Sequence, residues 1–347
     1  MPSISPNSLV LVTGASGFVA AWTCLELLKR GFTVRGTVRS KEKGDYLKKL
    51  FEVFKDKFSY VIVEDLEKND AFDDAAKGVD GIAHIASPFH FNTTDPHRDL
   101  ITPAINGTLA LLQAGKKSTT VKRVVLTSSF AAVGSPKDPN HIFTAKDWNE
   151  HSLRLMEEKG AQVDKQQAYR ASKVLAEKAA WNFMEDKSLH FDLVTLCPPW
   201  VFGPIIHQVS TADSLNTSVK AFYRFLIGQA PVENAQAPMG LAVDVRDLAM
   251  AHANALIAEG VGGNRYLVPK APYTFQDFLD VVHEDTHLRK GDWPAAPVGI
   301  PGNGKKVQHI AFDATPSETD LGMVYRPMRE TVIDMCNSLK DRSKEWE

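Results

Sequence analysis

The sequence predicts an α/β protein, in which a doubly wound parallel sheet carries a smaller, mostly helical C-terminal lobe. Three observations support this prediction. In the first two hundred residues, short apolar segments rich in Val and Ile alternate with segments at helical spacing. A glycine-rich turn joins the first apolar segment to the first helical one. Beyond residue 200, stretches rich in Pro and Gly separate further helical segments.

The strands are predicted from continuous apolar runs, because a parallel sheet is covered by helices on both faces. The runs are Leu9–Thr13, Thr33–Val38, Phe58–Val63, Gly81–Ile85, Arg123–Thr127 and Leu193–Cys197. Helical spacing falls between them over Phe18–Arg30, Lys41–Lys55, Ala71–Lys77, Arg98–Lys117 and Gln166–Lys187. Later helices are expected at Ser214–Leu226, Asp244–Ala258, Phe275–His287 and Arg329–Leu339.

The change of character near residue 200 predicts two domains. We expect residues 1–200 to form the first, with a return of the chain around 240–268. The lobe is then built from residues 201–239 and 269–347. Asp244, Arg246 and Asp247 lie at the expected return, where we expect them to cap a helix and tie the two parts together.

Composition excludes several classes of protein. The chain has 347 residues, 44% of them hydrophobic, and a net charge of -2, so it has ample core and no basic face for nucleic acid. No apolar run approaches the roughly 18 residues of a membrane span, and no signal peptide is visible at the N-terminus. Cys24, Cys197 and Cys336 are isolated, which predicts buried reduced thiols in a cytoplasmic protein.

One metal-binding motif occurs by letter. Residues 283–287 read HEDTH, which matches the zinc-binding pattern HExxH. A zinc site also needs a third ligand, and the following residues, LRKGDW, offer no histidine or carboxylate at an obvious position. We interpret the motif as the solvated end of a helix and predict no metal.

The glycine turn reads VTGASGFVAAW from Val12 to Trp22, and it joins a strand to a helix. Gly14 permits the tight turn, Gly17 lets a pyrophosphate approach the backbone, and the small Ala20 lets the helix press on the sheet. The N-terminus of the helix supplies free N–H groups and a positive dipole end. This context predicts a dinucleotide-binding Rossmann domain.

The end of the second strand indicates which dinucleotide binds. An acidic residue there would bind the ribose diol of NAD, but the sequence has Val38 followed by Arg39. Arg39, Ser40 and Lys43 can together neutralise a 2′-phosphate, so we predict NADP(H). Asp65, after the third strand, can accept a hydrogen bond from the adenine amine or can simply cap a helix.

A second constellation predicts proton transfer. Tyr169 and Lys173 are four residues apart on a helix, so they share one face. We expect the ammonium of Lys173 to lower the pKa of the Tyr169 phenol and so to tune it for proton transfer to or from an alcohol oxygen. Ser129, at the carboxyl end of the fifth strand, can donate a hydrogen bond to a carbonyl oxygen and polarise it.

The segments TGASGFVA, TSS, YRASK and PPWVFGP resemble the extended short-chain dehydrogenases/reductases, and within them the dihydroflavonol reductase-like group. The chain looks most like the fungal NADPH-dependent aldehyde and ketone reductases of the methylglyoxal/isovaleraldehyde type. The resemblance runs from about Leu9 to the C-terminus. It implies a catalytic triad of Ser129, Tyr169 and Lys173, with Lys173 also on the nicotinamide ribose.

The resemblance also implies the cofactor contacts. Arg39 and Lys43 would hold the 2′-phosphate, and Pro198 and Val201 would flank the nicotinamide. The full set of implied positions is Gly14, Ser16, Gly17, Phe18, Val19, Arg39, Lys43, Asp65, Leu66, Ala86, Tyr169, Lys173, Pro198, Val201 and Ser218.

These observations predict an NADPH-dependent carbonyl reductase that takes a small-molecule aldehyde or ketone and acts as a monomer or homodimer. Phe89, Phe130 and Trp200 are candidates for the substrate pocket, together with residues of Ser214–Arg224, and they favour an apolar or aromatic substrate. Two alternatives stay open: an NAD(P)-dependent nucleotide-sugar epimerase or dehydratase, and a non-catalytic NADP-sensing protein.

Overall fold

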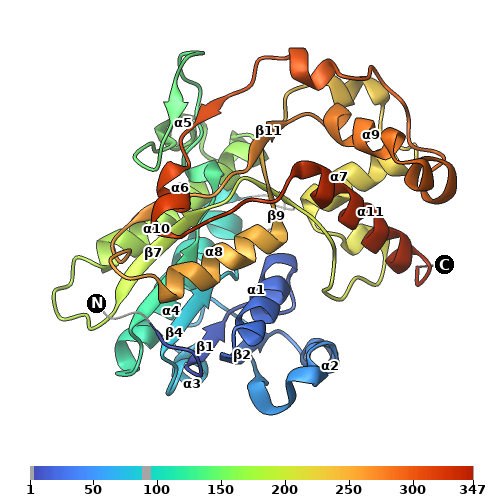
Figure 1. Cartoon of the computed structure of the whole chain (residues 1–347). Coiled ribbons are helices and arrows are strands. Elements are labelled where there is room, and N and C mark those ends of the chain that lie inside the picture. The colour runs from blue at the N-terminus through green and yellow to red at the C-terminus, as the bar shows by residue number, and fades with distance from the viewer. Residues whose placement is uncertain (1–3, 88–94, 347) are drawn as a thin grey trace.

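The computed structural model describes residues 4–87 and 95–346. Its centre is a seven-stranded parallel sheet with the order β10-β7-β5-β4-β1-β2-β3 (Figure 1). The strands are β1 (Leu9–Val12), β2 (Thr33–Val38), β3 (Phe58–Ile62), β4 (Gly81–His84), β5 (Arg123–Thr127), β7 (Asp192–Cys197) and β10 (Arg265–Leu267). The chain winds outward from β1 to β3 and then crosses back to β4, beside β1. The predicted doubly wound sheet is therefore confirmed, with its switch point between β1 and β4.

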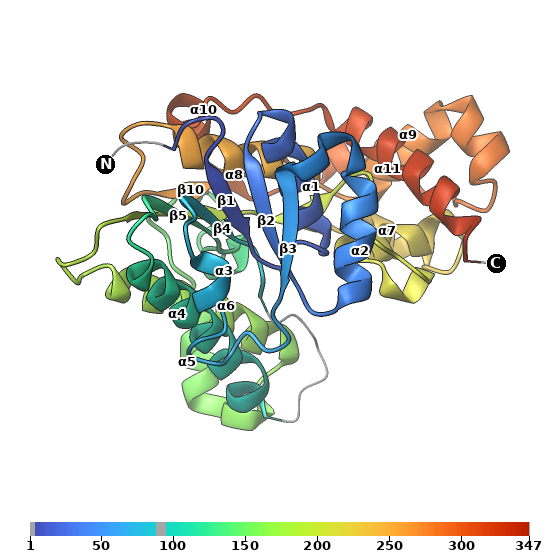
Figure 2. The same ribbon diagram turned by 90° about the horizontal axis from the view of Figure 1, so that it is seen from below.

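Helices cover both faces of the sheet (Figure 2). On one face, the buried core joins the sheet to α1 (Phe18–Lys29), α2 (Lys41–Leu50) and α8 (Val245–Ile257). On the other face, it joins the sheet to α3 (Asp73–Ala76), α4 (Thr102–Lys117) and α6 (Lys165–Phe183). A fourth helix on this side, α5 (Glu150–Lys159), packs against α6. The continuous apolar character of the strands follows from this double cover.

The C-terminal lobe is built around a small sheet and a core rich in aromatic rings. The strands are β8 (Trp200–Phe202), β9 (Gly240–Asp244) and β11 (Ala271–Tyr273), with β9 in the middle. The helices are α7 (Thr217–Leu226), α9 (Phe275–Glu284) and α11 (Met328–Ser343). The short α10 (Thr315–Asp320) packs near β10, and β6 (Ile142–Phe143) pairs with β12 (Ala311–Phe312). The predicted smaller lobe, mostly helical, is confirmed.

The return of the chain to the first sheet is held by charged groups. Asp244 caps α8 by accepting from the Arg246 N–H at 2.7 Å. The Arg246 guanidinium also reaches Asp334 of α11, and the hydroxyl of Thr331 donates to Asp244 at 2.8 Å. Asp247 pairs with Arg326 at the start of the C-terminal segment. The expected roles of these residues, to cap a helix and to tie the parts together, are confirmed.

Several elements differ from the sequence prediction. The helix predicted from Arg98 begins as a π-helical turn at His97–Ile101 and becomes regular only at Thr102. The helix predicted over Lys41–Lys55 ends at Leu50, and Lys55 takes a left-handed φ of 52°. The prediction missed β10 and α5 altogether.

The HEDTH motif lies at the end of α9. The ring of His283 is hydrogen bonded to the Pro297 carbonyl at 2.9 Å, and His287 pairs with Asp292 at 3.2 Å. The two histidines are thus engaged by different parts of the following loop.

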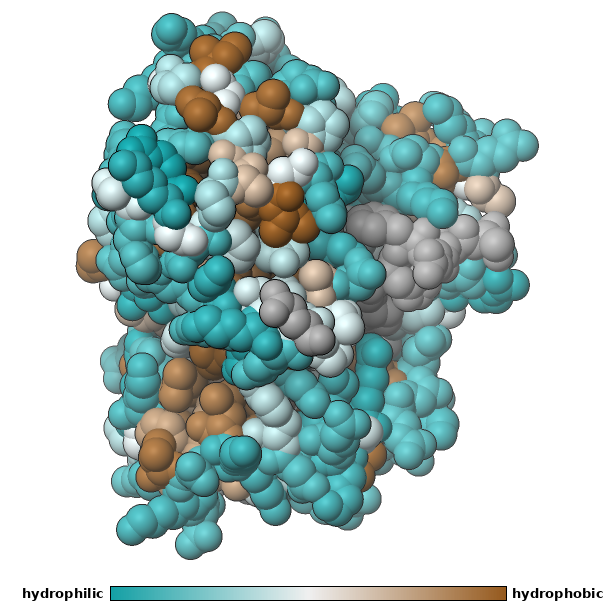
Figure 3. All heavy atoms as spheres, turned by 90° about the vertical axis from the view of Figure 1, so that its right-hand side faces the viewer, coloured by the Kyte–Doolittle hydropathy of each residue, from teal (hydrophilic) through white to brown (hydrophobic). Residues whose placement is uncertain are grey.

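Cys24, Cys197 and Cys336 are buried free thiols, as predicted. Within residues 4–87 and 95–346, no helix is long and apolar enough to cross a membrane. The face of the molecule in Figure 3 is mostly hydrophilic, with hydrophobic residues in small separate groups.

Candidate active site

The glycine turn forms a cradle at the carboxyl end of β1. Gly14 has a φ of 64°, and a Cβ atom added there would lie 3.1 Å from the Cβ of Ala86 on the neighbouring strand end. The turn is fastened to β2 because the Gly14 N–H donates to the Thr37 hydroxyl at 2.9 Å. Only glycine fits this position without strain, because a side chain would press on Ala86 and the backbone is in the left-handed region.

The first turn of α1 is open to an anion. The first helical hydrogen bond of α1 runs from the Ala21 N–H to the Gly17 carbonyl at 2.9 Å. The N–H groups of Phe18, Val19 and Ala20 therefore have no carbonyl partner within the helix. In the described part of the chain, no side chain caps this end and no acidic residue lies in its first turn. This arrangement suits a pyrophosphate.

Arg39 and Lys43 follow β2 at the same edge of the sheet. Arg39 is exposed and Lys43 is half-buried, and neither forms an ion pair within the described residues. Ser40 caps α2 by accepting from the Lys43 N–H at 3.4 Å. Two cations without counter-charges beside the glycine turn fit a 2′-phosphate. The exposed Asp65 accepts from the Glu67 N–H at 2.9 Å within a turn, so it does not cap a helix in this structure, and Leu66 beside it is half-buried.

The switch point is held by one hydroxyl. Thr13 Oγ1 accepts from the N–H groups of Ile85 and Ala86, both at 3.0 Å, and is hydrogen bonded to the buried His84 ring at 2.9 Å. This contact fixes the ends of β1 and β4 side by side. Ala86, a predicted cofactor contact, therefore lies against the glycine turn.

Ser129, Tyr169 and Lys173 lie close together, because the end of β5 and the helix α6 are adjacent. Ser129 lies two residues after the end of β5, and its hydroxyl is hydrogen bonded to Tyr169 on α6. Lys173 is one turn further along α6, with Nζ 5.7 Å from the centre of the Tyr169 ring. The Lys173 ammonium donates to the Ser87 hydroxyl at 2.7 Å, beyond the end of β4. The three groups thus face the carboxyl ends of β4 and β5.

The electrostatics of this cluster differ from the sequence prediction. Burial raises the pKa of Tyr169 to about 12, and the hydrogen bond with Ser129 and the charge of Arg170 only partly oppose it. Burial also lowers the pKa of Lys173 to about 8. The prediction that the Tyr169 pKa is lowered is therefore wrong for this structure, because burial outweighs the groups that oppose it and the Lys173 ammonium is turned toward Ser87.

A buried carboxylate lies behind the cluster. Glu177 is 1% exposed and lies two turns after Tyr169 on α6. It accepts from Arg265 at 2.8 and 3.0 Å, from the Ser128 hydroxyl at 2.5 Å and from the Thr195 hydroxyl at 2.8 Å. Since Ser128 precedes Ser129, this network supports the strand end that carries the candidate catalytic serine.

The residues predicted to flank the nicotinamide and the substrate lie on the same side of the sheet. The Pro198 carbonyl accepts from the Phe130 N–H at 2.8 Å, and the Phe130 ring lies edge-on to Phe143 at 5.6 Å. Trp200 and Val201 are half-buried on β8 against the lobe. Ser218 donates its hydroxyl to the Val201 carbonyl, so it is bound to the protein here. Phe89 lies outside the described residues.

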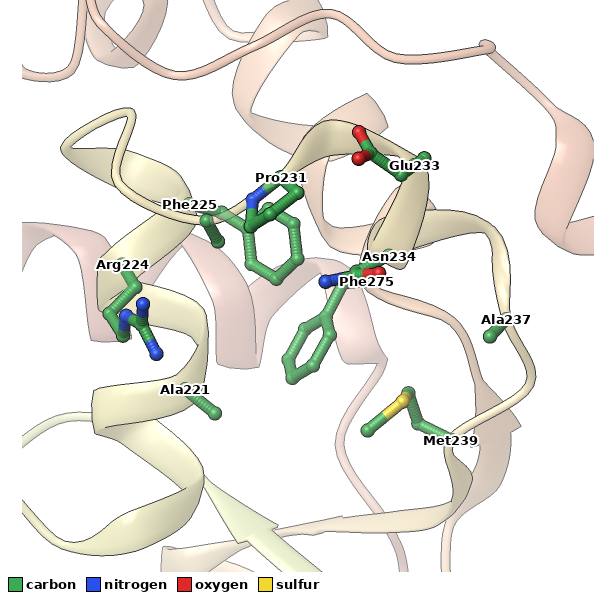
Figure 4. A pocket seen from close by; sticks show the side chains of 10 residues that line it. Ala221, Arg224, Phe225, Pro231, Glu233, Asn234, Ala237, Met239 and Phe275 are labelled. Carbon is green, nitrogen blue, oxygen red and sulfur yellow. The ribbon is translucent and has the colours of Figure 1, made fainter.

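A separate surface pocket of about 460 Å³ opens in the lobe (Figure 4). Phe275 and Met239 point into it, and Arg224 of α7 lies at one side. Its lining consists of Ala221, Arg224, Phe225, Ala230, Pro231, Glu233, Asn234, Ala237, Met239 and Phe275. Ala221 and Arg224 belong to the segment predicted to line the substrate pocket, but none of the triad residues borders this pocket.

Sequence reasoning missed three residues of the site. The Ser87 hydroxyl accepts a hydrogen bond from Lys173, and the position of Ser87 after the fourth strand could have indicated this. Glu177 continues the spacing of Tyr169 and Lys173 by one more turn, which was visible in the sequence. The buried His207 packs against Phe18 at the start of α1, and no local pattern predicts that contact.

The fold, the glycine turn and the cluster at the switch point define a dinucleotide-binding protein of the doubly wound class. The chain belongs to the NAD dependent epimerase/dehydratase family, whose model matches residues 10–268.

Relatives extend the likeness over nearly the whole chain. The NADPH-dependent methylglyoxal reductase of Saccharomyces cerevisiae is 37% identical and covers 95% of this chain and 97% of its own length. A ketoreductase of Aspergillus niger is also 37% identical, over 96% of this chain and 98% of its own. The crystal structure of yeast methylglyoxal/isovaleraldehyde reductase complexed with NADPH superposes with a TM-score of 0.86 at 35% identity, over 97% of this chain and 99% of that one. The predicted family resemblance is confirmed.

Proposed function

We propose that the protein is an NADPH-dependent carbonyl reductase that converts an apolar or aromatic aldehyde or ketone to an alcohol. The observation that carries this proposal is the meeting of Ser129, Tyr169 and Lys173 beside the glycine turn. The full-length likeness to a methylglyoxal reductase and a ketoreductase supports the reaction type.

NADPH fits the residues that are present. Gly14 permits the tight turn against Ala86, the first turn of α1 has free N–H groups, and Arg39 and Lys43 form no ion pair with any residue that the structure describes. We assign the pyrophosphate to Gly14–Val19 and the 2′-phosphate to the two cations. Bound there, NADPH would supply the hydride for the reduction.

The chain's own residues handle the proton. Ser129 and Tyr169 would bind the carbonyl oxygen by hydrogen bonds and polarise it. The raised pKa of Tyr169, about 12, keeps the phenol protonated at neutral pH, which is the form that can donate its proton to the forming alkoxide. Lys173, on the same face of α6 as Tyr169, would hold the nicotinamide ribose.

The substrate side is assigned from the aromatic groups near the cluster. Phe130 lies one residue after Ser129, and Trp200 lies on β8 beside the half-buried Val201. We assign both to the substrate pocket. A cytoplasmic location, a monomer or homodimer, and the two-domain division at residue 200 with its return at 240–268 are part of the same proposal.

The test is NADPH consumption against a panel of aldehydes, aryl ketones and keto esters, with NADH in parallel. Tyr169→Phe should lower kcat/KM by about 10²–10⁴-fold, the usual contribution of a general acid. Tyr325→Phe is the matched control, because it removes another tyrosine–serine hydrogen bond, with Ser317 at 2.7 Å, away from the cluster.

Each other outcome favours an alternative. NAD that stays tightly bound through purification, without consumption of NADPH, would favour an epimerase or dehydratase. Binding of NADPH with no turnover of any carbonyl would favour the sensing protein.

A further inference from the structure

We propose that His207 is a further cofactor-binding residue, whose imidazole donates a hydrogen bond to a phosphate oxygen of the bound dinucleotide. It lies in residues 204–210, which we call the covering segment, after β8. The inference rests on the proposed function, since it requires NADPH to bind at the glycine turn.

The position of His207 is the first support. Its side chain is 6% exposed, and its ring centre lies 5.4 Å from that of Phe18. Phe18 is the first residue of α1, where the free N–H groups of the phosphate site begin. The covering segment therefore passes beside the end of the helix to which we assign the pyrophosphate.

The second support is that the ring nitrogens of His207 lack hydrogen-bond partners in the described structure. His207 Nδ1 is fully enclosed and has no hydrogen-bond partner in the described structure. Nε2 has no protein partner there either, but it is not fully enclosed. Because Nε2 is on the open side of the ring and no described protein group is bonded to it, this nitrogen is available to a ligand. A proton on Nε2 gives the ring one donor toward the open side, and it leaves Nδ1 as the enclosed lone pair.

The charges around His207 favour an anion. Lys43 of α2 and Arg342 of α11 both act on the ring, and together with burial they lower the pKa of His207 to about 4, with burial the largest cause. The imidazole is therefore neutral at pH 7, and its one N–H can donate a hydrogen bond in a region where two cations favour an anion. The acidic groups near it are engaged: Glu42 accepts from Gln208 and Glu345 from Arg342.

The covering segment is held from both parts of the molecule. From α2, the Tyr46 hydroxyl donates to the Ile206 carbonyl at 2.9 Å and accepts from Arg342 at 2.8 Å. From α11, the Ser338 hydroxyl accepts from the Ile205 N–H at 3.1 Å, and beyond its end Trp346 donates to the Val209 carbonyl at 3.1 Å. A segment fixed in this way presents His207 without an ordering cost when the cofactor binds.

The test compares two variants by the position of their side-chain nitrogen. His207→Gln places an amide near the position of Nε2, whereas His207→Asn reaches only the position of Nδ1. Dissociation constants for NADPH and NADH are measured by titration of the purified full chain without substrate. His207→Asn should bind about tenfold or more weakly, as expected for loss of a hydrogen bond to a charged group, and His207→Gln should stay within about threefold of wild type. His190→Asn, at an exposed histidine bonded to the Ser118 carbonyl, is the control.

The comparison of NADPH with NADH shows which phosphate group His207 contacts. Equal weakening for NADPH and NADH assigns His207 to the pyrophosphate, and weakening for NADPH alone assigns it to the 2′-phosphate. Wild-type affinity in His207→Asn, or equal loss in both variants, overturns the inference and leaves the proposed function intact. If the wild-type chain itself fails to bind NADPH, the proposed function falls and the inference falls with it.

Discussion

Replacement of Glu177 by Gln tests the buried network behind the triad. The carboxylate is 1% exposed and pairs with Arg265, whose side chain is 8% exposed. Glu177→Gln keeps the size of the side chain but leaves the guanidinium without its counter-charge. It also weakens the bond to the Ser128 hydroxyl, one residue before the candidate catalytic serine.

The loss of stability expected for Glu177→Gln depends on the contacts that Arg265 retains. Removal of one partner of a buried ion pair costs about 3–5 kcal/mol. Arg265 still donates to the carbonyls of Ala145 and Asp147 and lies 3.9 Å from the centre of the Trp148 ring, so we expect the lower end, about 3 kcal/mol. For a chain of 347 residues, an unfolding entropy of about 0.7 kcal/mol/K turns this loss into a Tm lower by about 4 °C.

The assay is thermal unfolding followed by circular dichroism, with Glu150→Gln as the matched control. Glu150 pairs with Lys178 at 2.7 Å, but its side chain is 58% exposed, so its loss should cost less than about 1 kcal/mol. If the Tm of Glu177→Gln matched that of the Glu150 control, the buried pair would not be the support that we describe.

Three further predictions follow from single features. Gly14→Ala should destabilise the protein by about 1–2 kcal/mol, because φ is 64°, and should weaken NADPH binding; unfolding in urea and cofactor titration measure both, and wild-type values would contradict the cradle. Arg39→Ala should lower the preference for NADPH over NADH in kcat/KM by about tenfold or more, and an unchanged ratio would remove Arg39 from the 2′-phosphate site. Burial lowers the pKa of His84 to about 3 and of His207 and His252 to about 4, so the folded state binds fewer protons than the unfolded state between those values and 6.5. As the pH is lowered below 6.5, the free energy of unfolding should therefore decrease, by up to about 4 kcal/mol per pH unit near pH 5. A urea midpoint that stays constant from pH 7 to pH 4.5 would contradict this.

The parts that the sequence predicted are those that depend on local patterns. The strands β1 to β5 and β7 were visible as apolar runs, and the glycine turn was visible because Gly14 stands between a strand and a helix. The shared face of Tyr169 and Lys173 follows from helix geometry alone. These patterns also fix the switch point, since parallel strands place their carboxyl ends at one edge.

The parts that were missed depend on distant contacts. The strand β10 has only three residues, Arg265–Leu267, and it becomes a strand by pairing with β7. The pKa of Tyr169 depends on how deeply the site is buried, which the spacing to Lys173 cannot show. His207 acquires its surroundings from α1, α2 and α11, three segments far apart in the chain.

The transfer of hydride to a carbonyl carbon is the central claim, and isotopic labelling tests it most directly. The purified protein is given NADPH deuterated at C4, in each of the two stereochemical forms, with an aryl ketone or aldehyde that it consumes. Mass spectrometry of the product should show one deuterium on the carbinol carbon from one form only, and Tyr169→Phe should make the product much more slowly. An alcohol without deuterium from either form, or no alcohol from any carbonyl, would contradict the proposed reduction.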